Sequence, residues 1–150
     1  MTSAPAAHLR NSTLISIGIS MAISAAFFLL VFGLKPVISV FAPDNLALDF
    51  IPQTLAAGFM AALMPALQTR NKMVAGSLAG APPLPLQIAK RAVWLAVATL
   101  ALAAAVTALL WLGGIETMPW GSALALKTGY GGLLGLIITP IALRAILPRG

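Results

Sequence analysis

One charged residue, Lys127, lies inside an otherwise apolar stretch of this sequence, and Tyr130 follows it three residues later. On a helix this spacing puts both side chains on one face. An ammonium group in apolar surroundings can bind an anion or pair with a carboxylate, and a charge inside a membrane suggests a functional site by default. The acidic residues that it could pair with are Asp44, Asp49 and Glu116. We therefore treat Lys127, Tyr130 and Glu116 as a candidate substrate or ion-pair site.

A second interpretation of Lys127 requires no site, and it is the one that we favour. Lys127 falls in the first turns of the last apolar stretch, close to the acidic Glu116. The flexible stem of a lysine lets its ammonium reach the lipid headgroups while the methylenes stay in hydrocarbon. Such snorkelling predicts an ammonium group at the membrane surface, whereas a binding site predicts a buried one.

Serines recur at intervals of four along the first apolar stretch, a spacing that places them in one slowly drifting stripe on a helix. The stripe consists of Ser12, Ser16, Ser20 and Ser24. Small residues let helix backbones approach closely in lipid, where packing replaces the hydrophobic driving force. We therefore expect Ser16, Ser20 and Ser24 to pack against another helix. The alternative is a polar path through an oligomer, lined by these hydroxyls and Lys127.

Small residues repeat in the same way in two other apolar stretches. Gly58 and Ala62 are four residues apart in the second stretch, and Gly131 and Gly135 form a GxxxG pattern in the fourth. Both pairs are typical of close helix packing in membranes. We expect this packing to occur within one bundle, and the alternative is the face of a homodimer.

The residue types that this sequence lacks exclude several kinds of chemistry. The chain has no cysteine and a single histidine, His8, near its N-terminus. It therefore lacks thiolate catalysis, cysteine-based metal sites and bis-histidine haem ligation within one chain. The apolar stretches contain no Asp or Glu, so a proton-coupled exporter would lack its usual exchange carboxylate. We expect no enzymatic activity, no cofactor and no metal.

The composition is that of a membrane protein. Apolar residues make up 60% of the 150-residue chain and charged residues 8%, against about 25% charged in an ordinary soluble domain. The net charge is +6, but the bases lie at the ends of the apolar stretches instead of clustering with aromatic residues. This pattern favours contact with anionic lipid over nucleic-acid binding.

Four stretches are suited to crossing a hydrocarbon core, which needs about 20 apolar residues. They cover residues 14–34, 51–67, 92–112 and 123–147, with a central linker over residues 69–91. The sequence therefore predicts a single all-α domain of four transmembrane helices. Trp111 and Trp120 flank the short loop between the third and fourth stretches, and Trp94 marks the other end of the third stretch. These positions are typical of interfacial anchors.

The charges are sorted between the gaps. The three acids and Lys35 fall after the first and third stretches, and seven of the nine bases fall in the N-terminal tail, the 69–91 linker and the C-terminal end. Those seven are Arg10, Arg70, Lys72, Lys90, Arg91, Arg144 and Arg149. The positive-inside rule then places both termini and the linker in the cytoplasm. Together with the high alanine and leucine content, this pattern suggests a bacterial inner membrane.

The order of the stretches predicts two helical hairpins, which are candidates for a two-fold internal repeat. A shift of 75 residues aligns Pro65 with Pro140. An arginine lies within the next five residues after each proline, at Arg70 and Arg144. The endings Leu63-Met64-Pro65-Ala66-Leu67 and Ile138-Thr139-Pro140-Ile141-Ala142-Leu143-Arg144 carry a resemblance. On these residues the chain resembles small bacterial inner-membrane proteins of unknown function built from two-helix hairpins. That resemblance implies the span order but no activity.

These observations favour a non-enzymatic membrane protein that acts as a packing, scaffold or accessory subunit. Its expected partners are the lipid bilayer and a second copy or another membrane protein. The alternative is a transporter or channel subunit that works as an oligomer, with Lys127 and the serine stripe along its path.

Overall fold

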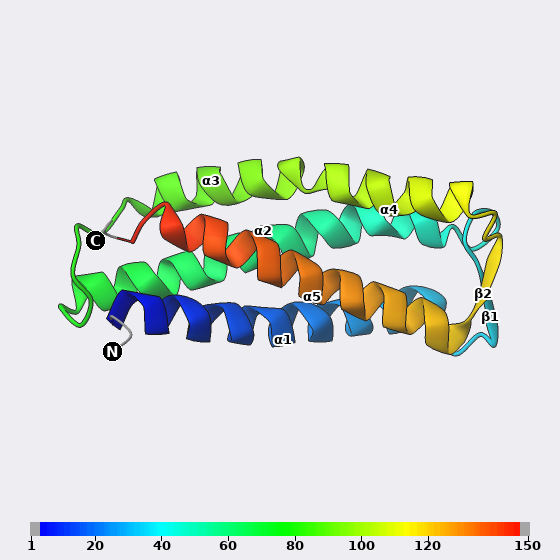
Figure 1. Ribbon diagram of the computed structural model, residues 1–150, viewed down its shortest axis with the longest axis horizontal. Coiled ribbons are helices and arrows are strands. Elements are labelled where there is room, and N and C mark those ends of the chain that lie inside the picture. The colour runs from blue at the N-terminus through cyan, green and yellow to red at the C-terminus, as the bar shows by residue number, and fades with distance from the viewer. Residues whose placement is uncertain (1–3, 148–150) are drawn as a thin grey trace.

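The computed structural model describes residues 4–147 and contains four long helical rods that lie side by side (Figure 1). Each rod is long and apolar enough to cross a membrane. The helices are α1 (Ala4–Phe32), α2 (Leu46–Val74), α3 (Pro85–Ala98), α4 (Leu100–Leu112) and α5 (Trp120–Arg144). The prediction of an all-α protein with four candidate transmembrane helices is confirmed, and the four helices indicate a membrane location.

The helices extend beyond the predicted apolar stretches at several ends. The first helix begins ten residues before residue 14, and α2 covers residues 46–74 instead of 51–67. The predicted 69–91 linker is thereby reduced to residues 75–84. Hydropathy detects only the part of a helix in hydrocarbon, whereas a helix can continue through the headgroup region, for a total of about 40–45 Å. Pro52 and Pro65 lie inside α2, so Pro65 does not end that helix.

The third rod is interrupted only at Thr99, between α3 and α4. Thr99 keeps right-handed helical backbone angles, with φ −74° and ψ −8°. Its hydroxyl donates a hydrogen bond to the Ala96 carbonyl at 2.7 Å. Residues Pro85–Leu112 therefore form one continuous span, which we call the α3–α4 arm.

A two-stranded antiparallel sheet joins the two loops at one end of the rods. Strand β1 (Val37–Ser39) pairs with β2 (Thr117–Pro119), so that Ile38 lies opposite Met118. The sequence analysis expected only loops here. The β-branched Val37, Ile38 and Val40 were the available signal, because such residues favour strands. The sheet links the loop after α1 to the loop before α5.

The most extensive helix packing joins segments that are far apart in the chain. The most extensive helix–helix interface joins α1 and α5, and α2 packs against both α5 and α3. In Figure 1, α1 and the α3–α4 arm run along opposite sides of the bundle, with α2 and α5 between them. The chain does connect α1 to α2 and α4 to α5 through short links, but the two-hairpin arrangement and the repeat stay predictions.

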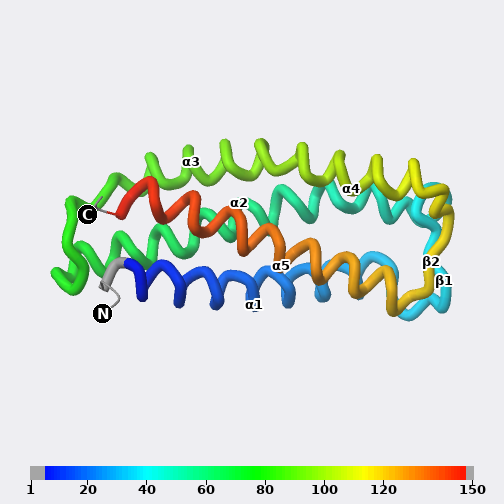
Figure 2. Tube along the Cα trace, in the orientation of Figure 1, coloured from blue at the N-terminus to red at the C-terminus, as the bar shows by residue number. Residues whose placement is uncertain are grey.

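The ends of the bundle carry opposite charge. The start of α1, the 75–84 loop and the end of α5 lie at one end, and the β1–β2 sheet lies at the other (Figure 2). All three acids belong to the sheet end, whereas most of the described bases lie at the opposite end. Arg149, one of the seven sorted bases, lies outside the described residues.

Candidate functional site

Lys127 and Asp49 form a buried ion pair between α5 and α2. Lys127 is 0% exposed, and its Nζ lies 2.6 Å from Oδ2 of Asp49, whose side chain is 10% exposed. The same ammonium lies 4.3 Å from the centre of the Phe50 ring. Lys127 is about 10 Å along the helix axis from Trp120, at a rise of 1.5 Å per residue. The pair therefore lies inside the bundle, below the sheet end.

This geometry contradicts the snorkelling interpretation of Lys127. The lysine stays buried because α2 begins at Leu46, which places Asp49 in its first helical turn. A carboxylate held in the bundle stabilises the ammonium there, so the side chain does not have to reach the headgroups. The same finding corrects the expectation that no helix of the bundle carries an acid. Glu116 is exposed, and its backbone carbonyl accepts a hydrogen bond from Val40 N, so it is not the partner of Lys127.

Other polar side chains of α2 and α5 surround the ion pair. Gln53 Nε2 donates to the Lys127 backbone carbonyl at 3.2 Å. The hydroxyls of Thr54 and Tyr130 lie 2.6 Å apart, and the Tyr130 ring packs edge-on against Phe50 with centroids 4.9 Å apart. Tyr130 thus belongs to the same site as Lys127, although it does not contact the ammonium through a hydrogen bond. We call Asp49, Gln53, Thr54, Lys127 and Tyr130 the outer polar cluster.

Two buried polar atoms near this cluster have no hydrogen-bond partner among the described residues. They are Gln53 Oε1 and Ser24 Oγ, and both side chains are 0% exposed. Gln53 bonds the carbonyl of Lys127, and Ser24 packs against Gly131, one helical turn further along α5. A buried acceptor or hydroxyl without a partner costs free energy. The same two groups could hydrogen-bond a polar solute or water at this turn.

A second polar contact joins three helices further along the bundle. Thr139 Oγ1 on α5 lies 2.9 Å from the Ala61 carbonyl of α2 and 2.7 Å from Ser16 Oγ of α1. Pro65 has no N–H, so the Ala61 carbonyl lacks its ordinary helical donor. Since a hydroxyl carries one proton, Thr139 can donate to Ala61 and accept from Ser16. The threonine thus satisfies a carbonyl that the proline leaves open.

The serine stripe and the GxxxG pattern face each other across the α1–α5 interface. Ser16, Ser20 and Ser24 are buried, and a Cβ added at Gly131 would lie 2.7 Å from the Ser20 carbonyl. A Cβ at Gly135 would lie 3.0 Å from the Ile17 backbone nitrogen and from the Ser16 carbonyl. The backbones approach this closely because neither helix places a large side chain at the crossing.

The small residues Gly58 and Ala62 of α2 lie against the α3–α4 arm and α5. A Cβ added at Gly58 would lie 3.0 Å from Thr99 Oγ1 and 3.4 Å from Cα of Ala96. Ala62 is 1% exposed and lines a groove between α2, α3 and α5. Gly58 therefore lies at a close approach between α2 and the α3–α4 arm.

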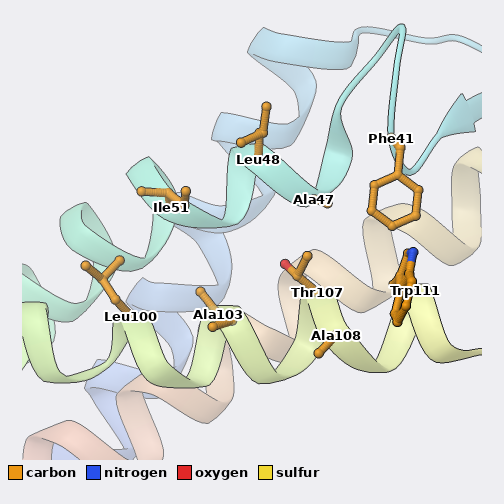
Figure 3. Close-up of a pocket in the computed structure, with 10 residues that line it drawn as sticks. Phe41, Ala47, Leu48, Ile51, Leu100, Ala103, Thr107, Ala108 and Trp111 are labelled. Atoms are coloured by element: carbon orange, nitrogen blue, oxygen red, sulfur yellow. The ribbon is translucent and has the colours of Figure 1, made fainter.

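A large apolar groove, which we call the α2–α4 groove, opens between the first half of α2 and the α4 part of the arm. It has a volume of about 670 Å³. In Figure 3, Phe41 and Trp111 lie at one end of the groove, and Leu100 lies at the other. Its remaining lining residues are Ala47, Leu48, Ile51, Ala103, Ala104, Thr107 and Ala108. The groove exists because α2 packs closely against α3 and only sparsely against α4.

The residues that bind metals do not converge. Within residues 4–147, no group of three or more His, Cys, Asp and Glu side chains could hold a metal ion. His8 instead joins α1 to α2, with Nε2 2.9 Å from Thr69 Oγ1 and Nδ1 3.3 Å from Lys72 Nζ. His8 therefore contributes to helix packing.

The sequence analysis missed Gln53, Thr54 and Thr139, and it assigned Asp49 to a loop. The sequence did contain a signal for Gln53, since Asp49 and Gln53 are four residues apart and would share a helix face. Thr139 could have been noted as a hydroxyl residue of the fourth stretch. The partner of Thr139 could not have been predicted, because Ala61 and Thr139 are 78 residues apart.

Comparison with known proteins gives no relative for this chain. Neither the protein families nor the curated proteins and solved structures that were compared with it produced a match. The resemblance to small proteins built from two-helix hairpins therefore stays a prediction.

Proposed function

We propose that this chain is a non-enzymatic membrane protein, an accessory or scaffold subunit that binds a transmembrane helix of another subunit through the α2–α4 groove. The observation that carries the proposal is this groove of about 670 Å³, almost wholly apolar, along the side of the bundle. Because hydrophobic drive is absent between helices in lipid, association depends on close packing. A preformed concave surface lets a partner helix pack closely against the bundle.

The side chains on the arm's wall of the groove fit a helix better than they fit disordered lipid chains. Ala104 and Ala108 are exposed, line the groove and are four residues apart on α4. Such spacing of small residues lets a second backbone approach, as in GxxxG packing. The bulky Ile51, Leu48 and Trp111 supply the surrounding contact area. The partner helix comes from a second copy of the chain or from another membrane protein.

The proposed setting is a bacterial inner membrane with both termini in the cytoplasm. Its support is the separation of the acids at the sheet end from most of the bases at the other end. Reporter fusions test it directly. A fusion at residue 80 should report the cytoplasm, and fusions at residues 45 and 116 should report the periplasm. A periplasmic signal at residue 80 would overturn the orientation.

Photocrosslinking tests the groove itself. A benzophenone amino acid at Ala104 or Ala108 should give a discrete protein adduct in native membranes. An adduct at twice the mass of the chain would indicate a second copy, and another mass would indicate a different subunit. Ala105 is the matched control, because it is an exposed alanine of α4 that does not line the groove. If all three positions give only lipid adducts, the proposal fails.

A second candidate function is a transporter or channel subunit, and the outer polar cluster favours it. A buried lysine with a carboxylate partner is unusual in hydrocarbon, and Gln53 Oε1 and Ser24 Oγ have no hydrogen-bond partner among the described residues. Solute or proton flux in proteoliposomes that is lost in both Lys127→Met and Lys127→Met/Asp49→Asn would favour this function. The double variant keeps the cluster neutral, so its loss of flux would not reflect an unpaired charge.

A further inference from the structure

We propose that the smaller groove of the bundle, between α2, α3 and α5, is a binding site for an anionic phospholipid. This groove has a volume of about 260 Å³ and lies toward the basic end. It is separate from the α2–α4 groove, and the proposal does not depend on the accessory function.

The walls of this groove suit an acyl chain. Ala62 and Ala66 of α2 and Ala92 of α3 are buried against it, and Ile141 of α5, which is 50% exposed, also lines it. Among residues 4–147, Arg91 is the one charged side chain that lines it. A chain of methylenes would therefore contact apolar atoms along the groove and meet a cation at one position.

Arg91 is placed to bind a phosphate. Its Nη1 donates one hydrogen bond, to the Ala145 carbonyl at 3.1 Å. A guanidinium has five N–H donors in a planar fork, so several remain for phosphate oxygens. Arg91 is exposed, and Trp94, which lines the groove one turn along α3, is 75% exposed. Tryptophan favours the headgroup level of a membrane.

The charge around the site selects anionic over zwitterionic lipid. The described bases at this end are Arg10, Arg70, Lys72, Lys90, Arg91 and Arg144, and the three acids lie at the other end. A zwitterionic headgroup also carries a phosphate, but its ammonium group would be repelled by the same bases. The larger α2–α4 groove has no charged lining residue, so it should not select for lipid charge.

Tryptophan quenching by brominated lipids can read each groove separately. Trp94 lines the smaller groove and Trp111 the larger one. The Trp111→Phe variant reports on Trp94, the Trp94→Phe variant reports on Trp111, and the variant with both changes gives the background from Trp120. Each is reconstituted in vesicles that contain phosphatidylcholine and phosphatidylglycerol, with bromine on the acyl chains of one lipid or the other.

At equal mole fraction, we expect brominated phosphatidylglycerol to quench Trp94 with about a fivefold apparent preference over brominated phosphatidylcholine, which corresponds to ~1 kcal/mol. Trp111 should show no preference. Arg91→Gln should reduce the preference at Trp94 to near one, whereas Lys90→Gln should retain most of it, because Lys90 does not line the groove. Ile141→Phe, which fills the groove and keeps Arg91, should also reduce it.

Three results would overturn the proposal. One is equal quenching of Trp94 by the two lipids, and another is a preference that survives Arg91→Gln. The third is an equal preference at Trp111, which would mean that the anionic lipid gathers around the whole protein. The emission of Trp120, whose indole donates to the Gly33 carbonyl at 2.7 Å, checks the fold in the variant that lacks Trp94 and Trp111.

Discussion

The two sides of this bundle are held together by different means. Helices α1, α2 and α5 form a three-helix core that is joined by an ion pair, hydrogen bonds between helices and close backbone contacts at glycines. The α3–α4 arm packs against this core mainly through α3. In the most apolar part of each span, the buried share is 50% in α2, 39% in α5, 22% in α1 and 17% in the arm. Grooves remain on both sides of the arm where it meets α2.

This difference follows from the physics of packing in lipid. Apolar contact alone gives little preference between a neighbouring helix and an acyl chain, so helices associate through small residues and polar contacts. The core has both kinds of contact. The arm has a close approach at Gly58 and Thr99, and its α4 half lines an almost wholly apolar groove. We therefore expect substitutions in the core to change stability and substitutions in the arm to change what binds to it.

The largest effect should come from Lys127→Met. This change leaves Asp49 charged, mostly buried and without its partner, at a cost of about 3–5 kcal/mol in the free energy of unfolding. Unfolding in mixed micelles measures it. The double variant Lys127→Met/Asp49→Asn should recover much of the loss, because no charge then remains. An equal loss in the single and double variants would show that the ion pair does not contribute to the difference between core and arm.

Gly131→Leu should be the next most damaging change. The new side chain would collide with Ser24 and with the Ser20 carbonyl of α1, and overpacking of this kind costs about 1–3 kcal/mol. Gly129→Leu is the matched control on the same helix, because a Cβ at Gly129 meets no atom within 4 Å. Thermal unfolding in detergent should separate the two variants, and equal stability would place the glycine face against lipid.

Thr139→Val should have a smaller effect. It removes the hydroxyl that lies 2.9 Å from the Ala61 carbonyl, and hydrogen bonds between membrane helices are worth about 0.6 kcal/mol on average and up to about 1.7. The cost should shrink in a Pro65→Ala background, since alanine restores the N–H that proline withholds from Ala61. Thr107→Val, in the groove of the arm, should be nearly silent in the same unfolding measurement. A large effect at Thr107 would weaken the contrast between the two sides.

The smallest effect should come from the sheet end and depend on pH. A hydrogen bond from Lys35 lowers the pKa of the Asp44 carboxyl, and the Ser39 backbone N–H adds to this effect. Since the pKa is lower in the folded state, the contribution to stability is complete above the unfolded value of about 3.9. It is lost as the pH falls through the folded value. The difference in melting temperature between the native chain and Asp44→Asn should therefore shrink below about pH 4. A constant difference would contradict this.

Much of the fold could be predicted from the sequence, but less of the site. Hydropathy located all four spans, because about 20 consecutive apolar residues have few alternatives to a transmembrane helix. The small-residue spacing identified Gly131, Gly135 and the serines, since helical periodicity is local. Lys127 and Tyr130 stood out by residue type. Asp44, Asp49 and Glu116 were all possible partners of Lys127, and the sequence could not select Asp49, which is 78 residues away.

The sequence by itself determined the number of spans, their apolar character and the separation of acids from most of the bases. These properties depend on short windows of the chain and on the free energy of transferring their side chains from water to lipid. Only the tertiary structure decided that α1 packs against α5, that Lys127 meets Asp49 and that Thr139 satisfies the carbonyl opposite Pro65. Each of these contacts joins distant segments through one or two hydrogen bonds or a few ångströms of backbone approach. Residue type and spacing along the chain do not specify such pairs, because they depend on how the helices are positioned relative to one another.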